Sequence, residues 1–252
     1  MSTSRAAMPL LALLALVAGG TAAYPTLQTA VADVEPPWDP GRPSVAATGS
    51  GVVDRLPDVP GYDRSCRQGR GCVFGPAWSD ATDAPMSRNG CDTKNDIRRA
   101  QMREVVIKPG TNGCVVTAGV ITDPYDGTVV RYARGQQPAA VQIDHVIPLA
   151  WAWNAGAAQW PLERRATFAN DPSNLQVTGS QTNRAKSDKG PGEWADEISE
   201  PGRRCAFLRK AAAVVQTYQL SITRDDAAAF ARCGITYDSA SGPETTRGKE
   251  TR

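Results

Sequence analysis

The sequence predicts an α+β fold that is stapled by disulfides, and three observations lead to this prediction. Runs rich in β-branched side chains and bounded by turn residues favour strands at residues 114–122, 128–132 and 141–146. Helices are expected at residues 95–105, 203–220 and 224–233, the first and the last of them after a polar capping residue. An even count of six cysteines favours three disulfides.

The first helix is expected to begin at a cap supplied by Asp92 or Thr93 and to stop before Pro109. Its three arginines are interpreted as a solvated face rather than as a site; they are Arg98, Arg99 and Arg103. The next two runs are joined by Asp123-Pro124-Tyr125-Asp126-Gly127, in which proline fixes φ and glycine supplies a positive φ. These runs should form a β-hairpin, and its turn is given no catalytic role.

The strand at residues 141–146 ends in Asp144 and His145, and a helical segment rich in alanine and tryptophan follows at residues 149–168. We expect its tryptophans to pack in the core, although they could instead stack on the bases of single-stranded nucleic acid; they are Trp151, Trp153 and Trp160.

Residues 171–176, which include Asn174, should form a second short strand and its approach. Ser180 is expected to cap a short helix that stops at Gly190. This helix carries Asn183, Arg184 and Lys186. Because residues three apart share one helical face, the first and last of these can point into the same groove.

Composition divides the 252 residues into four parts. Residues 1–32 have a positive start, a short apolar run and small-residue cleavage candidates, so they predict a signal peptide and secretion to the extracellular space. The apolar run is shorter than a membrane-spanning helix requires, so an uncleaved membrane anchor is the weaker alternative. Residues 33–57 are interpreted as a flexible linker, 58–236 as one folded domain and 237–252 as a disordered tail.

The six cysteines fit an exported protein, because disulfides persist in oxidising surroundings. They are Cys66, Cys72, Cys91, Cys114, Cys205 and Cys233. Fifteen pairings are possible for six cysteines, and closeness in sequence favours Cys66 with Cys72, Cys91 with Cys114, and Cys205 with Cys233. A structural zinc site is the weaker alternative, since no Cys-x-x-Cys pair occurs.

A formal net charge of +2 excludes a protein that coats nucleic acid along its whole surface. It does not exclude an enzyme that needs only a local basic groove. His145 is the only histidine, and imidazole is the side chain whose ordinary pKa lies nearest neutrality. Any general-base chemistry at pH 7 therefore falls to His145.

The order Asp144-His145, then Asn174-Leu175-Gln176, then Asn183-x-x-Lys186 resembles the motif of HNH (ββα-metal) nucleases. It is most similar to the HNH domain of secreted actinobacterial endonuclease-family proteins and of the C-terminus of modification-dependent restriction enzymes. The resemblance implies a ββα-metal core with an added β-hairpin and flanking helices. The helical segment at residues 149–168 is then an insertion relative to the minimal motif.

The resemblance also implies hydrolysis of phosphodiester bonds, with DNA favoured as the substrate and RNA left open. Asp144 and Asn183 offer hard oxygen ligands that suit Mg²⁺ or Mn²⁺, and His145 is assigned to water activation. Asn174 is expected to tie the loop to the strand and to help position His145. Arg184 and Lys186 are assigned to phosphate.

Two other classes of function remain open. One is a non-catalytic module that binds nucleic acid or a cell-surface partner on the same fold. The other is a hydrolase that pairs His145 with a cysteine nucleophile, which is disfavoured because all six cysteines are expected in disulfides. In every case the mature protein is expected to be a monomer that needs no membrane.

Overall fold

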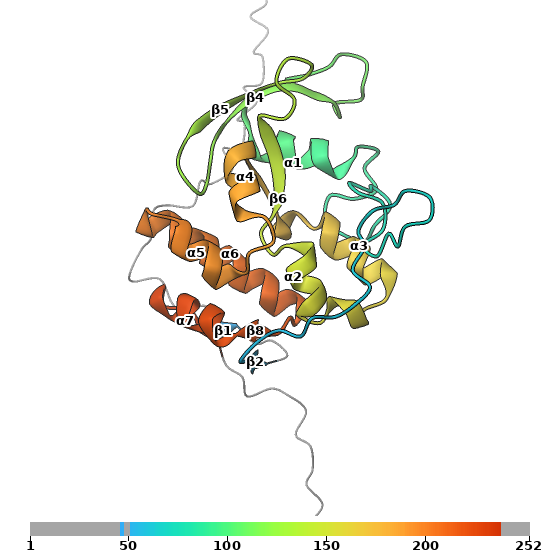
Figure 1. Ribbon diagram of the computed structural model, residues 1–252. Coiled ribbons are helices and arrows are strands. Elements are labelled where there is room, and N and C mark those ends of the chain that lie inside the picture. The colour runs from blue at the N-terminus through green and yellow to red at the C-terminus, as the bar shows by residue number, and fades with distance from the viewer. Residues whose placement is uncertain (1–45, 48–50, 238–252) are drawn as a thin grey trace, which may run out of the picture. The chain divides into compact units, whose positions relative to one another are not determined.

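Residues 46–47 and 51–237 are described by a computed structural model of the chain (Figure 1). The predicted signal peptide, most of the predicted linker and residues 238–252 of the predicted tail lie outside the described residues. The described part is mixed α+β, with small sheets and seven α-helices. Among the described residues no helix is both long enough and apolar enough to span a membrane.

A three-stranded antiparallel sheet lies on one side of β6 (Figure 1), in the order β3 (Arg103–Ile107), β4 (Val116–Thr122) and β5 (Val129–Ala133). The predicted hairpin is therefore present, with one strand more than expected. The first helix, α1 (Thr93–Gln101), begins at a cap formed by Asp92, as predicted, but ends four residues early. Val106 and Ile107 pair with Ala118 and Val116 of β4, and this strand pairing overrides continuation of the helix.

The hairpin of β6 (Val141–His145) and β7 (Leu175–Gly179) is antiparallel, and it pairs Asp144 with Gln176 and His145 with Leu175. Helix α4 (Ser180–Lys186) follows β7 directly and lies beside β6 (Figure 1). Its capping residue is Gly179 and not Ser180, which is already the first residue of the helix, and no side chain caps this end.

The insertion between the two strands holds α2 (Leu149–Asn154), a 3₁₀ turn η1 (Ala157–Gln159), α3 (Leu162–Asn170) and a second turn η2 (Pro172–Asn174). Trp153 is 7% exposed and lies within 6.2 Å, between ring centroids, of both Tyr62 and Phe74. Trp151 and Trp160 are partly buried against the same core. Packing in the core, rather than base stacking, accounts for these tryptophans.

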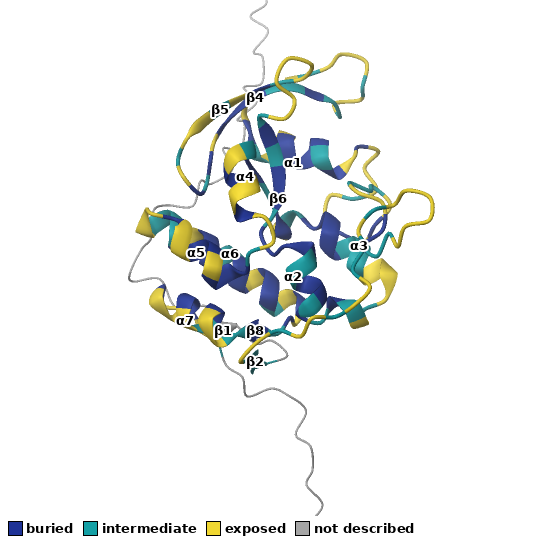
Figure 2. Cartoon of the chain, viewed as in Figure 1, coloured by how far each residue is buried: buried dark blue, intermediate teal, exposed yellow. Residues whose placement is uncertain are grey.

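The larger core forms around α5 (Pro191–Glu197), α6 (Pro201–Tyr218) and α7 (Arg224–Arg232), whose inward faces are buried (Figure 2). The expected stop at Gly190 is instead the capping position of α5, and Pro191 fits there because the first helical residue needs no N–H donor. Helix α7 starts at a capping box in which Thr223 and Asp226 bond each other's backbone N–H groups.

Part of the expected linker is folded. Strand β2 (Val52–Val53) pairs in parallel with β8 (Ile222–Thr223), and β1 (Ala46–Ala47) pairs in parallel with β9 (Thr236–Tyr237). Val52 and Leu56 also pack against the larger core. A flexible linker over residues 33–57 is therefore wrong for its described part, because apolar side chains bury there against the helices.

Three disulfides join Cys66 to Cys72, Cys91 to Cys114, and Cys205 to Cys233, and no cysteine is free in the described part of the chain. This is the pairing favoured by closeness in sequence. The disulfides exclude both the structural zinc site and a cysteine nucleophile. The last of them fastens the start of α6 to the end of α7.

Candidate active site

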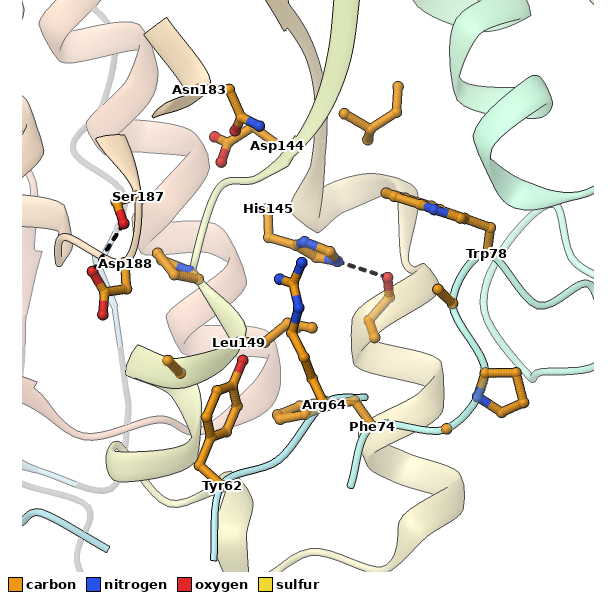
Figure 3. A pocket seen from close by; sticks show the side chains of 17 residues that line it. Tyr62, Arg64, Phe74, Trp78, Asp144, His145, Leu149, Asn183, Ser187 and Asp188 are labelled. Carbon is orange, nitrogen blue, oxygen red and sulfur yellow. Dashed lines mark hydrogen bonds between the residues drawn. The ribbon is translucent and has the colours of Figure 1, made fainter. Parts of the chain in front are cut away.

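A cavity of about 470 Å³ opens at the end of β6, between α2, α4 and the segment that precedes α1 (Figure 3). Asp144, His145 and Asn183 all line it. The structure thus brings together three residues that lie up to 39 positions apart in the sequence and that were predicted to act together. Arg64 and Trp78, which the sequence does not indicate as site residues, line the same cavity.

The imidazole of His145 is held in one tautomer. Its Nε2 lies 2.9 Å from the backbone oxygen of Ala169. Because a carbonyl oxygen can only accept, Nε2 must carry the proton, and in the neutral ring Nδ1 then keeps a free lone pair. Burial lowers the pKa of His145 from its ordinary 6.5 to about 4, and the charges of Lys186 and Arg64 act in the same direction. At pH 7 His145 is therefore neutral, with Nδ1 as its proton acceptor.

Trp78 covers one face of this imidazole. The two rings are stacked, with their centroids 5.9 Å apart and their planes inclined by 17°. The backbone of Trp78 has a φ of 60°, an uncommon conformation for a bulky side chain, which the surrounding structure must impose. Trp78 is partly buried against the smaller core, and its stacking also positions His145. No pattern in the sequence indicates this contact.

The lowered pKa of His145 predicts that the protein loses stability as the pH falls from about 6.5 to about 4. In this window the unfolded chain, with its ordinary pKa of 6.5, binds a proton that the folded chain does not, so protonation favours unfolding. The loss attributable to His145 is up to about 3 kcal/mol. Urea denaturation at pH 7 and pH 4.5 measures it, and the His145→Gln variant is the control that should lose less. An equal loss in both proteins would contradict the lowered pKa.

Asp144 is buried and bonded on both of its oxygens. Oδ2 accepts from the hydroxyl of Tyr125 at 2.6 Å, and Oδ1 accepts from Nζ of Lys186 at 3.0 Å. Nζ also donates to the backbone oxygen of His145 at 2.7 Å. Burial raises the pKa of Asp144 and lowers the pKa of Lys186, and each charge opposes the shift of the other.

Lys186 has no exposed surface. Its ammonium group cannot reach the phosphate of a bound strand while it is bonded to Asp144 and to the backbone of β6, so the phosphate-binding assignment of Lys186 is wrong in this structure. Helical spacing does place Asn183 and Lys186 on one side of α4, but that side faces the protein interior as well as the cavity. Arg184 is exposed on the same helix and does not line the cavity. Its phosphate-binding role stays a prediction.

Residues 92–233 match the family model described as GmrSD restriction endonucleases, C-terminal domain. The match covers more than half of the chain. This chain belongs to that family. The matched residues run from the cap of α1 to the last cysteine and contain Tyr125, Asp144, His145 and Asn183, whereas Arg64 and Trp78 lie before them.

The chain is also 34% identical, over 142 residues, to a protein of Arthroderma benhamiae named as an uncharacterized secreted protein. The aligned part is 56% of this chain and 65% of that protein, so the chain spans just under two thirds of its relative. No solved structure matches the chain. The secreted relative and the three disulfides together bear out the predicted extracellular location.

Within this GmrSD C-terminal domain, the turn of the β4–β5 hairpin does more than reverse the chain. The hydroxyl of Tyr125 donates to Asp144. Asp123 is buried, and its Oδ2 accepts from the backbone N–H of Gly179 at 2.7 Å and from the hydroxyls of Thr178 and Thr182. The turn therefore fastens the hairpin to the start of α4 and orients the acid of the site. Its only signal in the sequence is the Asp-Pro-Tyr-x-Gly run itself, which also suits an ordinary turn.

Asn174 makes the ties that the sequence analysis expects of it. Its side-chain oxygen accepts from the N–H of Ile147 at 2.8 Å and its nitrogen donates to the oxygen of Ile147 at 3.2 Å. The backbone oxygen of Asn174 accepts from the N–H of Val146 at 2.8 Å. These bonds fix the residues directly after His145, while a catalytic effect of Asn174 stays a prediction.

The oxygen donors of the cavity fit a divalent ion of the Mg²⁺ or Mn²⁺ type. Asn183 donates from Nδ2 to Gln142, which leaves its side-chain oxygen as the free acceptor. A carboxylate has about four acceptor positions. Because Tyr125 and Lys186 use two of them, about two acceptor positions of Asp144 remain for a metal ion. No group of three or more histidine, cysteine or acidic residues able to hold a metal occurs among residues 46–47 and 51–237. An ion here would therefore have few protein ligands and would keep positions open for water and phosphate.

Proposed function

We propose that the protein is a secreted, metal-dependent endonuclease that hydrolyses phosphodiester bonds of DNA. The observation that carries this proposal is a neutral His145 with Nδ1 available, in one cavity with the oxygens of Asp144 and Asn183. Membership of the GmrSD C-terminal family supports a nuclease. The order β6, β7, α4 agrees with the strand-strand-helix core of ββα-metal enzymes.

In this proposal Nδ1 of His145 accepts the proton of the attacking water. The bond from Nε2 to the backbone oxygen of Ala169 keeps the ring in the required tautomer, and Trp78 limits its rotation. Asp144 and Asn183 would hold a divalent ion, which when bound stabilises negative charge on the phosphate oxygens. Tyr125 and Lys186 orient the carboxylate of Asp144. Because the pKa of His145 is about 4, the base form is present throughout the neutral range.

We further propose that residues 1–32 are a removed signal peptide and that one folded domain, which begins with β1 and β2 rather than at residue 58, acts as a monomer. A non-catalytic nucleic-acid-binding module is the second candidate. It is favoured by one observation: the ammonium of Lys186 already balances the charge of Asp144, which lowers the need for a metal ion.

Purified mature protein incubated with plasmid DNA and with RNA, in Mg²⁺, in Mn²⁺ and in chelator, tests the proposal. We expect cleavage of DNA with either metal and none with chelator. Calorimetric titration with Mn²⁺ should show about tenfold or greater loss of affinity in Asp144→Ala and Asn183→Ala. Gln181→Ala, which removes an exposed amide from the same helix, should bind metal like the parent protein. DNA binding without cleavage under all conditions would favour the binding module.

A further inference from the structure

A second pocket lies beside the candidate active site and carries an excess of positive charge. Three cationic side chains line it: Lys94, Arg98 and Arg134. Its one carboxylate, Asp92, is committed to capping α1, since its two oxygens accept from the backbone and side-chain nitrogens of Asn95. Asp92 keeps its negative charge while it caps the helix, and this charge acts on Lys94 and Arg98. Three cations against one carboxylate still leave the lining with an excess of positive charge.

Arg98 is the least expected of these side chains. It is 4% exposed, so the prediction that it lies on a solvated face is wrong. In the described part of the chain it forms no ion pair with an acidic residue. One of its terminal nitrogens donates to the hydroxyl of Tyr132 at 3.1 Å, its guanidinium lies 4.4 Å from the centre of the Tyr132 ring, and its Nε has no hydrogen-bond partner. Burial lowers the pKa of Arg98, and the charge of Asp92 opposes this shift without forming an ion pair with the guanidinium. A buried guanidinium that lacks a direct ion pair is costly, and a bound anion would offset part of that cost.

The other two cations approach the same space from different elements. Lys94 is half-buried on α1 with its Nζ 5.9 Å from the centre of the Trp78 ring, and Arg134 is exposed after β5. Burial and the charges of Arg98 and Arg134 lower the pKa of Lys94. Repulsion between these like charges therefore destabilises the free protein. A bound polyanion would relieve this repulsion, so the arrangement suits the binding of a polyanion.

The pocket adjoins the candidate active site, with Trp78 between the two cavities. Ala77 and Trp78 line both cavities, and the Trp78 ring stacks on His145 while Lys94 lies over it. A nucleic-acid strand with one phosphate at His145 would pass across Trp78 to reach the cations. A groove lined by positive charge follows the backbone of a strand, and these cations provide such a lining.

We propose that Lys94, Arg98 and Arg134 form a phosphate subsite, which holds a backbone phosphate of the substrate strand next to the one attacked at His145. This inference deepens the proposed nuclease function and rests on it for the identity of the strand. These three side chains line a pocket, whereas Lys186 has no exposed surface and is bonded to Asp144 and to the backbone of His145. The subsite therefore takes the place of Lys186 as the source of phosphate contacts.

The test is binding of a fluorescent single-stranded oligonucleotide in chelator, where cleavage cannot occur, over a range of salt concentrations. Arg98→Met and Arg134→Gln should each raise Kd about tenfold and should flatten the slope of log K against log salt by about 0.7. Arg98→Met also removes the hydrogen bond to the buried hydroxyl of Tyr132, so its Tm is recorded beside its Kd. Arg134 is exposed, so Arg134→Gln should keep the Tm of the parent protein and tests the subsite without a change in stability. Arg134→Lys should restore most of the affinity, because it keeps the charge.

Arg131→Gln is the matched control. It removes an exposed arginine of β5 that lies outside the pocket and pairs with Glu104, so its Kd should stay within about twofold of the parent protein. Equal losses in Arg131→Gln and Arg134→Gln, or unchanged binding in Arg98→Met and Arg134→Gln, would overturn the subsite. A protein that binds in this pattern but does not cut with metal would retain the subsite and lose the proposed nuclease function.

Discussion

Replacement of His145 by alanine should lower the rate of DNA cleavage by about two to four orders of magnitude, the usual contribution of a positioned general base. The affinity for DNA should change little, since the assigned phosphate contacts lie elsewhere. The variant should fold, because His145 is only half-buried and its side chain makes a single hydrogen bond, to Ala169. Initial rates of plasmid nicking at saturating Mg²⁺, together with a thermal melt, measure both effects.

Added imidazole separates a chemical role of His145 from a structural one. The alanine variant leaves space between Trp78 and Ala169, and a free imidazole bound there could accept the proton in place of the missing ring. Partial recovery of the rate, dependent on imidazole concentration, is expected only if the ring is the base. Cleavage by His145→Ala as fast as by the parent protein would refute the assignment.

The parts of the fold that the sequence predicts are those set by local patterns. Strand β6, the β4–β5 hairpin and the α1 cap follow from β-branched runs, a Pro-Gly turn and one aspartate. The end of α1 does not follow from local patterns, because it is decided by the pairing of β3 with β4, whose residues come later in the sequence. The same holds for β2, whose two valines give too short a run to indicate a strand without its partner β8.

The residues of the candidate site also fall into two groups, those that the sequence predicts and those that only the structure shows. Asp144, His145, Asn174 and Asn183 belong to an ordered motif that can be read along the chain, and the structure gathers them at the end of β6. Tyr125 reaches Asp144 from 19 residues away and Trp78 reaches His145 from 67 residues away. No periodicity connects residues at such separations, so only the tertiary structure shows these contacts.

Lys186 shows a different limit. Helical periodicity states which residues share a face, and it does so correctly for Asn183 and Lys186, but it does not state whether the face meets solvent or core. A lysine at the end of a short helix usually reaches water. Here the carboxylate of Asp144 and the backbone oxygen of His145 hold it inside. The buried pair has a consequence for stability that exceeds that of any surface charge.

Lys186→Met should therefore lower the free energy of unfolding by about 3–5 kcal/mol, because it leaves the carboxylate of Asp144 buried without its cation. Lys189→Met is the matched control. That lysine pairs with Glu197 nearer the surface, where loss of an ion pair costs about 1 kcal/mol or less. Urea denaturation in chelator measures both variants under the same conditions.

Removal of both charges distinguishes the buried pair from simple loss of packing. The double variant Asp144→Asn with Lys186→Met should recover part of the lost stability, since no uncompensated charge remains inside. Denaturation in the presence of Mn²⁺ is a second measurement. If Asp144 is a metal ligand, Mn²⁺ should stabilise Lys186→Met more than the parent protein, because the carboxylate then lacks a competing cation. If Lys186→Met loses no more stability than Lys189→Met, the buried pair contributes little and the orientation of Asp144 must depend on Tyr125 instead.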